Sequence, residues 1–412
     1  TNTAYAEPDE ILSQHRRYAL VVTDAVRDAK GDPVEPDPEF QACIARPGAY
    51  CERLAGALGR VALQVAPRRV AGGSVFTTLS ATAWLEKARA AIQNAPLGVQ
   101  LPKPRNVFAV ADLAKIVLQG QTTTANPPAF ANITVAIPGD GADRVAFGSF
   151  RSPRFLNEQS MIPATATGAR VALPAASEEL VFTAWLPKPP APASGYPTVI
   201  MGHGASNFHI QDSALVASTL AGRGFAVLCI NAVSHGYGPQ SRIMLTDKAG
   251  AVTELAAGGR GVDVNRDGKL DIVDLLATPE PVLFRDLLLQ TALDQMQLVR
   301  VIKAGLDLTG DGVPDLDRSR IYYLGKSMGS NIGTIVHAVE PDIQVAVLSD
   351  AGGSQMDVSC TARSAVAVGL LSLRKPPLFN LPGPSFDAAY ALRYQPVKII
   401  DLPGAIALQE WA

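Results

Sequence analysis

The sequence predicts an α/β protein, with a mostly parallel sheet covered by helices on both faces and a smaller mixed α/β domain before it. Between residues 179 and 348, short apolar segments alternate with segments of helical periodicity, which is the pattern of parallel strands joined by crossover helices. Residues 225–230 are apolar without interruption, as expected of a strand buried on both faces. The chain has 412 residues, 47% of them hydrophobic, enough for a large core and two domains.

Residues 1–150 are expected to form an N-terminal accessory domain, because they contain no motif that carries chemistry. A helix is expected around residues 78–93, where Ala, Leu and charged residues recur at helical spacing. Short strands are expected at residues 18–23, 107–110, 132–137 and 144–147.

Residues 151–412 are expected to form the second domain. Its first part, 150–174, is expected to be an extended connection that leads to the core. Gly222 and Gly224 end the expected helix 212–222, and leucines at helical spacing predict a long amphipathic helix at 282–304. The expected strands are an outer strand at 179–186, then 198–201, 225–230, 320–324 and 343–348.

The four cysteines bear on the cellular compartment. Cys43 and Cys51 flank a short Arg-Pro-Gly segment and are expected to form a small disulfide loop, with two free thiols as the alternative. A disulfide favours an exported protein. Cys229 lies in an apolar strand and is expected to be a buried thiol, and Cys360 has no expected partner.

The most informative motif is Gly325-Lys326-Ser327-Met328-Gly329, which lies between a strand-like and a helix-like segment. G-x-S-x-G in that context is the nucleophile elbow of the α/β-hydrolases, in which a tight turn holds the serine exposed at the carboxyl edge of the sheet. Residues 151–412 are therefore expected to form an α/β-hydrolase core with Ser327 as nucleophile. An inert serine in a Gly-rich turn is the alternative.

Two backbone amides are expected to stabilise the oxyanion of an acyl-transfer reaction. One is the N–H of Met328, directly after the serine, and the other is the N–H of Ala205, after the strand at 198–201. His203 is expected to orient that second loop.

The general base is not evident. In this fold the acid and then the histidine follow the serine, but only His337 follows Ser327, roughly 15 Å along a helix. His209 and His235 are expected near the site as pocket or structural residues, and His15 lies in the accessory domain.

The sheet is also expected to be incomplete at the C-terminus. Residues 351–396 are lid-like rather than strand–helix, and 397–402 is a short strand candidate. We therefore expect the catalytic acid–His pair to lie outside this chain, on a C-terminal continuation or a separate chain that completes the core. Asp350 is the in-chain candidate for the acid.

An insertion at about 239–281 contains a pattern typical of calcium loops. Side-chain oxygens fall at positions 1, 3, 5, 9 and 12 of the loop, a glycine stands at position 6, and position 7 offers a backbone carbonyl. A structural Ca²⁺ is expected, because hard oxygen ligands select it; a solvated turn is the alternative. The expected ligands are Asp263, Asn265, Asp267, Lys269, Asp271 and Asp274.

A second acidic loop, residues 307–317, repeats half of this pattern but has Arg318 at position 12, which cannot bind a metal. It is expected to be a turn that leads into the nucleophile strand.

Charge and hydropathy exclude two classes of partner. The net charge is −2 and no basic stripe is present, which argues against nucleic acid. No apolar run approaches the length of a transmembrane segment.

Several segments together resemble large bacterial exported lipases and esterases, which carry a virulence-factor-type lipase N-terminal domain before an α/β-hydrolase core. The resemblance implies a secreted or cell-surface protein that hydrolyses small-molecule, lipid or polymer esters through Ser327. A peptidase or amidase on the same fold and a non-catalytic calcium-binding adhesion module are the alternatives. The segments are Tyr18–Asp24, Met201–Gly204, Asp311–Asp315, Ile321–Gly329 and Leu402–Ala405.

Overall fold

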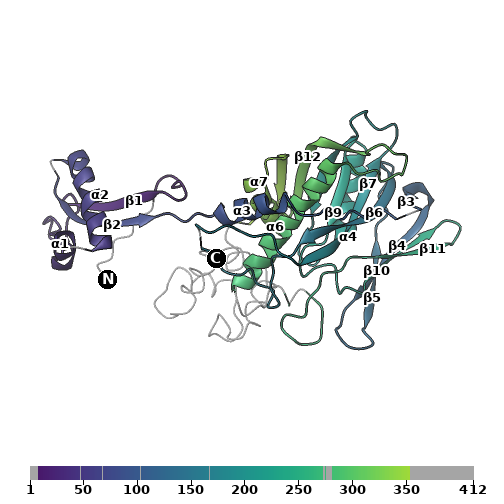
Figure 1. The fold of residues 1–412 in the computed structure, drawn as a ribbon, viewed down its shortest axis with the longest axis horizontal. Helices are drawn as coiled ribbons and strands as arrows, with labels where there is room; N and C mark the ends of the chain where they lie inside the picture. The colour runs from purple at the N-terminus through teal and green to yellow at the C-terminus, as the bar shows by residue number, and fades with distance from the viewer. Residues whose placement is uncertain are drawn as a thin grey trace. The chain divides into compact units, whose positions relative to one another are not determined.

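The structure, a computed structural model, describes residues 8–352 apart from residues 47, 67, 103, 167, 272, 273 and 275–280. Its internal contacts divide the chain into two compact units, Thr1–Trp84 and Leu85–Ala412 (Figure 1). The lid-like segment, the strand candidate at 397–402 and Cys360 lie outside the described residues.

The N-terminal unit pairs two antiparallel strands, β1 (Arg17–Thr23) and β2 (Val70–Thr77), with helices α1 (Pro38–Ala45) and α2 (Ala49–Val65) between them in the chain. Leucine and alanine at helical spacing on α2 pack against Val75 of β2 and form a small core. A disulfide between Cys43 and Cys51 joins α1 to α2 and confirms the expected pairing.

The larger unit is built on a seven-stranded sheet of order β13-β12-β8-β9-β7-β6-β3. The pairs from β13 to β9 are parallel and the pairs from β9 to β3 are antiparallel. The expected parallel sheet is therefore found in one half only. The strands are β3 (Asn106–Ala109), β6 (Ala142–Pro153), β7 (Ser177–Pro187), β8 (Tyr196–Gly202), β9 (Ala226–Ile230), β12 (Leu316–Lys326) and β13 (Ile343–Ser349).

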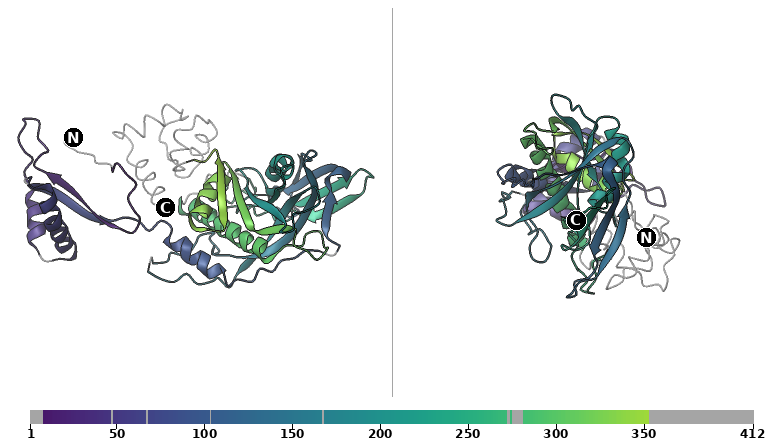
Figure 2. Two further views of the ribbon diagram at one scale, coloured as in Figure 1. Left: turned by 90° about the horizontal axis from the view of Figure 1, so that it is seen from above. Right: turned by 90° about the vertical axis from the view of Figure 1, so that its right-hand side faces the viewer.

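Helices cover both faces of this sheet. Phe147 of β6 packs in the core cluster with α4 (His209–Ala221), whereas Ser152 of the same strand donates a hydrogen bond to Asp294 of α6 (Pro281–Ala304). Residues an odd number apart point to opposite faces of a strand, so α4 and α6 lie on opposite faces. Helix α7 (Met328–Val339) packs beside α6, as the two green helices of Figure 2 show.

A second, four-stranded antiparallel sheet of order β11-β10-β4-β5 packs on the α4 face. Its strands are β4 (Leu113–Gln121), β5 (Phe130–Val135), β10 (Arg242–Asp247) and β11 (Val252–Ala256). The expected insertion at 239–281 thus contributes two strands to this sheet. Helix α3 (Ala83–Ile92) and the short helix η1 (Val110–Asp112) complete the described elements.

Two expectations about organisation are wrong. The boundary between the compact units follows Trp84 rather than residue 150, because β3 and β6 pair into the sheet that carries β7. Strand β7 is not an outer strand, since it lies between β9 and β6. Both errors have one cause: pairing between segments distant in sequence is not visible in local patterns.

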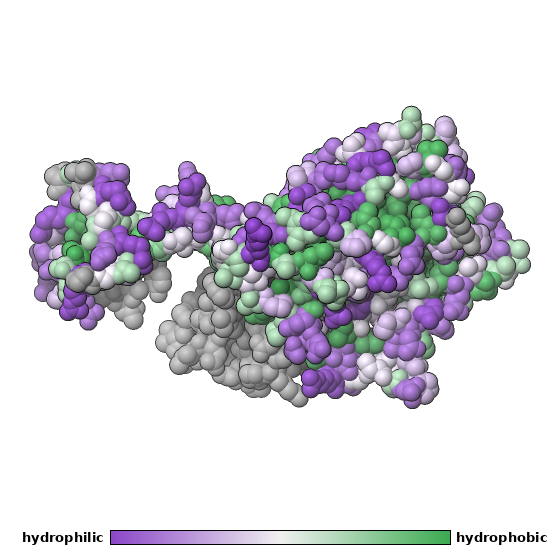
Figure 3. All heavy atoms as spheres, viewed as in Figure 1, coloured by the Kyte–Doolittle hydropathy of each residue, from purple (hydrophilic) through white to green (hydrophobic). Residues whose placement is uncertain are grey.

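On the face of the larger unit that Figure 3 shows, groups of apolar residues are interspersed with hydrophilic ones. Among the described residues, none of the helices has both the length and the apolar character needed to cross a membrane.

Candidate active site

Ser327 occupies the turn between β12 and α7 and has a strained backbone, with φ 52° and ψ −117°. A non-glycine residue at positive φ is uncommon, and such strain concentrates at functional sites. The side chain is exposed, and the residue stands at the N-terminus of α7. Strand, sharp turn and helix therefore follow one another as the G-x-S-x-G motif requires.

Glycines make this turn possible because the backbones approach closely. A Cβ on Gly329 would lie 2.1 Å from the carbonyl oxygen of Gly202, and a Cβ on Gly325 would lie 2.6 Å from the Cα of Ser330. The turn is also fixed to β13, since the N–H of Ser327 donates to the carbonyl of Ser349 at 2.9 Å. The serine is thus held by packing and by backbone hydrogen bonds.

The turn after β8 lies beside this serine. Strands β8 and β12 are parallel, with Gly202 opposite Gly325, so the segments that follow them leave the same edge of the sheet. A Cβ on Gly204 would be 3.7 Å from the Cβ of Ser327. In the described part of the chain, the amides of Ala205 and Met328 donate no hydrogen bond, so both remain available as donors.

Asp212, at the start of α4, fixes the geometry of this turn. Its carboxylate accepts hydrogen bonds from the N–H of Gly204 at 2.8 Å and from the Nδ2 of Asn207 at 3.3 Å. It also pairs with the Nζ of Lys326 at 2.9 Å. The Gly204 amide is therefore engaged, whereas the Ala205 amide is free to donate.

His203 holds the same turn through hydrogen bonds to the backbone. Its Nδ1–H donates to the carbonyl of Gly204, and its Nε2 accepts from the N–H of Ala232, both at 2.9 Å. Burial lowers the pKa of His203 to about 4, so the ring is neutral. This arrangement agrees with the orienting role expected for His203.

His209 is a structural residue. Its Nε2–H donates to the carbonyl of Ala257, and its Nδ1 accepts from the hydroxyl of Thr183. Burial lowers the pKa of His209 to about 4. Both ring nitrogens are thus occupied within the core.

None of the five histidines hydrogen-bonds to Ser327. His337 is exposed on α7, ten residues after the serine, and His15 belongs to the other compact unit. His235 donates through Nδ1 to the carbonyl of Val233. Asp350 follows β13 with φ 59° and accepts a hydrogen bond from the Ser349 hydroxyl.

In the expected calcium loop, carboxylates cap backbone amides. Asp263 accepts from the N–H groups of Asp267 and Gly268, and Asp274 accepts from those of Val264, Asn265 and Asp271. Burial raises the pKa of Asp274. Across the described residues, no group of three or more His, Cys, Asp or Glu side chains is arranged to hold a metal, and calcium in this loop stays a prediction from its sequence.

The second acidic loop leads into β12, as expected. Asp307 accepts from the N–H groups of Gly310, Asp311 and Gly312, and Asp315 accepts from those of Leu308 and Thr309. These hydrogen bonds close a tight turn.

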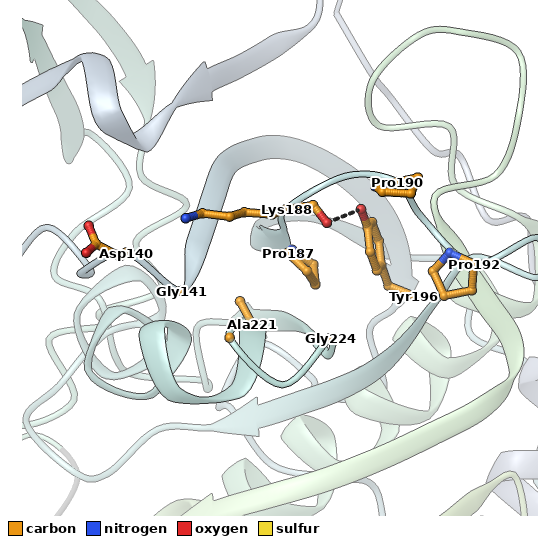
Figure 4. Close-up of a pocket in the computed structure, with 10 residues that line it drawn as sticks. Asp140, Gly141, Pro187, Lys188, Pro190, Pro192, Tyr196, Ala221 and Gly224 are labelled. Atoms are coloured by element: carbon orange, nitrogen blue, oxygen red, sulfur yellow. Dashed lines mark hydrogen bonds between the residues drawn. The ribbon is translucent and has the colours of Figure 1, made fainter.

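Two of the pockets in the described part of the larger unit can be compared with the position of Ser327. The larger, of about 420 Å³, is lined by prolines, Lys188 and Tyr196, whose hydroxyl donates to the Lys188 carbonyl at 3.2 Å (Figure 4). It lies where β8 begins, at the edge opposite Ser327. A smaller cavity of about 220 Å³ is lined by Ser206 and Asn207, from the turn beside Ser327.

Sequence reasoning missed Asp212 as part of the site. An acidic residue in the first turn of a helix is ordinarily a solvated helix-terminus charge. Here the side chain is only 1% exposed. The available signal was Lys326 beside the serine, a cation that needs a partner in a partly buried turn.

No protein-family model matches this chain, and no curated protein matches it. Solved structures similar to it include an acetyl xylan esterase from Paenibacillus sp. R4, at 14% identity and TM-score 0.38, covering 70% of this chain and 66% of that chain. Another is a cold-adapted esterase from an Arctic intertidal metagenomic library, at 17% identity and TM-score 0.28, covering 48% of this chain and 59% of that chain. This chain thus spans less than two thirds of the length of either structure.

Proposed function

We propose that this protein is a serine hydrolase of carboxylic esters with an α/β-hydrolase core, and that Ser327 is its nucleophile. The observation that carries the proposal is the strained, exposed Ser327 at the strand-to-helix turn, facing the Gly204 turn. A hydroxyl presented in this way is the first requirement for acyl transfer.

In the proposed reaction the Oγ of Ser327 attacks the ester carbonyl carbon and transfers its proton to a base. The N–H groups of Met328 and Ala205 donate to the carbonyl oxygen as it becomes an oxyanion, and the N-terminus of α7 adds a favourable dipole. The intermediate then releases the alcohol, which takes the proton from the base. Water, activated by the same base, hydrolyses the acyl-serine and restores the hydroxyl.

We propose that the base and its acid are contributed from outside this chain. The support is that all five histidines are described and none hydrogen-bonds to Ser327, while His203 and His209 use both ring nitrogens elsewhere. A C-terminal continuation or a separate chain that completes the sheet beyond β13 would supply them.

We also propose that the protein is exported and acts on a small-molecule, lipid or polymer ester. Export is supported by the Cys43–Cys51 disulfide, because such bonds persist in oxidising compartments. Intact-mass analysis of protein from cell fractions, before and after reduction, tests this point.

Labelling with a fluorophosphonate probe tests the nucleophile. With the segment or chain that supplies the base present, the probe is expected to add once to the wild-type protein and not to Ser327→Ala, as measured by intact mass. Ser160→Ala is the matched control, because Ser160 also has a positive φ, 59°, and should leave labelling unchanged. Labelling that persists in Ser327→Ala, or is absent from wild-type protein that includes the segment or chain supplying the base, contradicts the proposal. Parallel assays with butyrate esters and butyramides then separate an esterase from an amidase.

A further inference from the structure

Two of the residues that line the cavity of about 220 Å³ each carry a buried polar atom without a partner. Among the described residues, the Oγ of Ser234 and the Nε2 of His235 make no hydrogen bond, although these residues are only 8% and 4% exposed. Buried polar groups nearly always form hydrogen bonds, and a buried donor or acceptor without one costs about 1–3 kcal/mol of stability. Two unpaired atoms on residues that line the same cavity therefore point to a ligand that pairs with them.

The chemistry of His235 defines what that ligand offers. Its Nδ1–H donates to the Val233 carbonyl at 2.9 Å, so Nε2 carries the lone pair and is an acceptor. Burial, with the nearby His203 and Arg260, lowers the pKa of His235 to about 3. The ring is neutral at ordinary pH, so it accepts a hydrogen bond from a neutral donor rather than pairing with an anion.

The cavity adjoins the proposed active site. Ser206 and Asn207 line it, and they belong to the turn whose Gly204 lies against Ser327. The His235 ring also packs against His203, which holds that turn, with ring centroids 5.3 Å apart. Leu270 and Asp271 of the expected calcium loop also line it.

We propose that this cavity is a hydroxyl-binding subsite, which takes a short hydroxyl-bearing substituent of the ester. A hydroxyl of the ligand donates to the Nε2 of His235, and the hydroxyl of Ser234 pairs with the same or a neighbouring ligand oxygen. The volume is below that of pockets for drug-sized molecules, which suits a group of a few heavy atoms. The link to substrate choice rests on the proposed ester hydrolysis; the binding of hydroxyl groups does not.

The binding test uses Ser327→Ala, which cannot turn over substrate. Glyceryl monobutyrate and propyl butyrate share one carbon skeleton but differ by two hydroxyl groups. Titration with the glyceryl ester is expected to shift the ¹⁵N resonance of His235 Nε2 in the direction of hydrogen-bond acceptance. Propyl butyrate is expected to leave it in place. Equal responses to both, or none, mean that the cavity holds water only, and they overturn the proposal.

The kinetic test compares kcat/KM for the two esters. Wild-type protein is expected to prefer the glyceryl ester, and His235→Phe, which keeps an aromatic ring but loses the acceptor, is expected to reduce that preference about threefold to tenfold. His235→Gln places an amide oxygen near the position of Nε2 and is expected to restore part of the preference for the glyceryl ester. A preference that survives in His235→Phe contradicts the subsite.

The two proposals fail in different ways. If wild-type protein that includes the segment or chain supplying the base hydrolyses neither ester, the proposed function fails, while the resonance of His235 still decides whether the cavity binds hydroxyl groups. If it hydrolyses both equally well and the resonance does not move, only the subsite fails. Ser234→Gly tests the contribution of the Ser234 hydroxyl. Glycine is chosen because Ser234 has φ 62°, a backbone conformation that glycine adopts without strain.

Discussion

Asp212 connects the residue before the proposed nucleophile to the turn that offers the oxyanion donor. One carboxylate oxygen accepts from the Gly204 amide and the other pairs with Lys326. Asp212 is buried and Lys326 is partly exposed. The lysine side chain therefore extends inward from the surface, and its ammonium group pairs with the buried carboxylate. We infer that this single side chain sets the distance between Ser327 and the Ala205 amide.

Replacing Asp212 with alanine is expected to lower kcat about tenfold to a hundredfold with little change in KM. The reason is that the Ala205 donor acts mainly in the transition state, and misplacement of one such donor is costly. Steady-state kinetics on a butyrate ester measure the effect. Asp212→Asn, which keeps an acceptor for the Gly204 amide, is expected to lose less.

The control for this change is Glu254→Ala, which removes an exposed ion pair between Glu254 of β11 and Arg242 of β10. Exposed pairs contribute about 0–1 kcal/mol, so activity and stability should stay near wild type. If Asp212→Ala behaves like Glu254→Ala, the positioning role is wrong.

At the level of elements, the elbow depends on β8 and α7 approaching without side chains between them. Gly329→Ala is expected to push α7 away from β8, because its Cβ would meet the Gly202 carbonyl at 2.1 Å. We expect loss of nearly all activity and a clear drop in thermal stability, measured by ester hydrolysis and by unfolding followed by circular dichroism.

Gly59→Ala is the matched substitution, since Gly59 lies inside α2 with nothing within 4 Å of a Cβ. It is expected to keep activity and to stabilise the helix by up to about 1 kcal/mol. Similar losses in both variants would show that the close approach of β8 and α7 is not the cause.

The Asp263–Asp274 loop is the second element whose role can be tested. Calcium there stays a prediction from the spacing of its oxygens. If it binds, calcium should raise the Tm of chelator-treated protein, magnesium should do so less, and Asp263→Asn should reduce the response. Identical melting curves with and without calcium would refute the prediction.

At the level of the whole molecule, three buried neutral histidines make folding sensitive to acid. Their pKa values are lowered by burial to about 4 in His203 and His209 and about 3 in His235. The unfolded chain protonates such residues near pH 6.5. Below that pH the unfolded state binds more protons than the folded state, so the free energy of unfolding decreases as the pH falls.

We therefore expect stability to decline between pH 6.5 and about 4, by up to about 1.4 kcal/mol per pH unit for each histidine. Urea unfolding at several pH values, followed by tryptophan fluorescence, measures the slope. His209→Gln should reduce that slope by about one histidine's share. A slope unchanged by this substitution would show that other groups cause the acid sensitivity.

Local sequence patterns were enough to predict many of the strands and helices of the larger unit. The strands β8, β9, β12 and β13 and the helices α4, α6 and α7 were predictable within a few residues, because buried strands and amphipathic helices have distinctive periods. The Cys43–Cys51 pairing was predictable from spacing alone. The four-stranded sheet was not, since β4 and β10 are separated by more than a hundred residues and pair only in the fold.

What the sequence determined by itself is the identity of the reactive group and the turn that presents it. Glycines two residues on either side of Ser327 predict a sharp bend, because a bend that tight leaves no room for side chains at those positions. Only the tertiary structure placed Asp212 under the Gly204 turn and left Ser234 and His235 without partners around a cavity. The physical reason is that burial and hydrogen-bond satisfaction depend on neighbours brought from distant parts of the chain, and no local spacing encodes them.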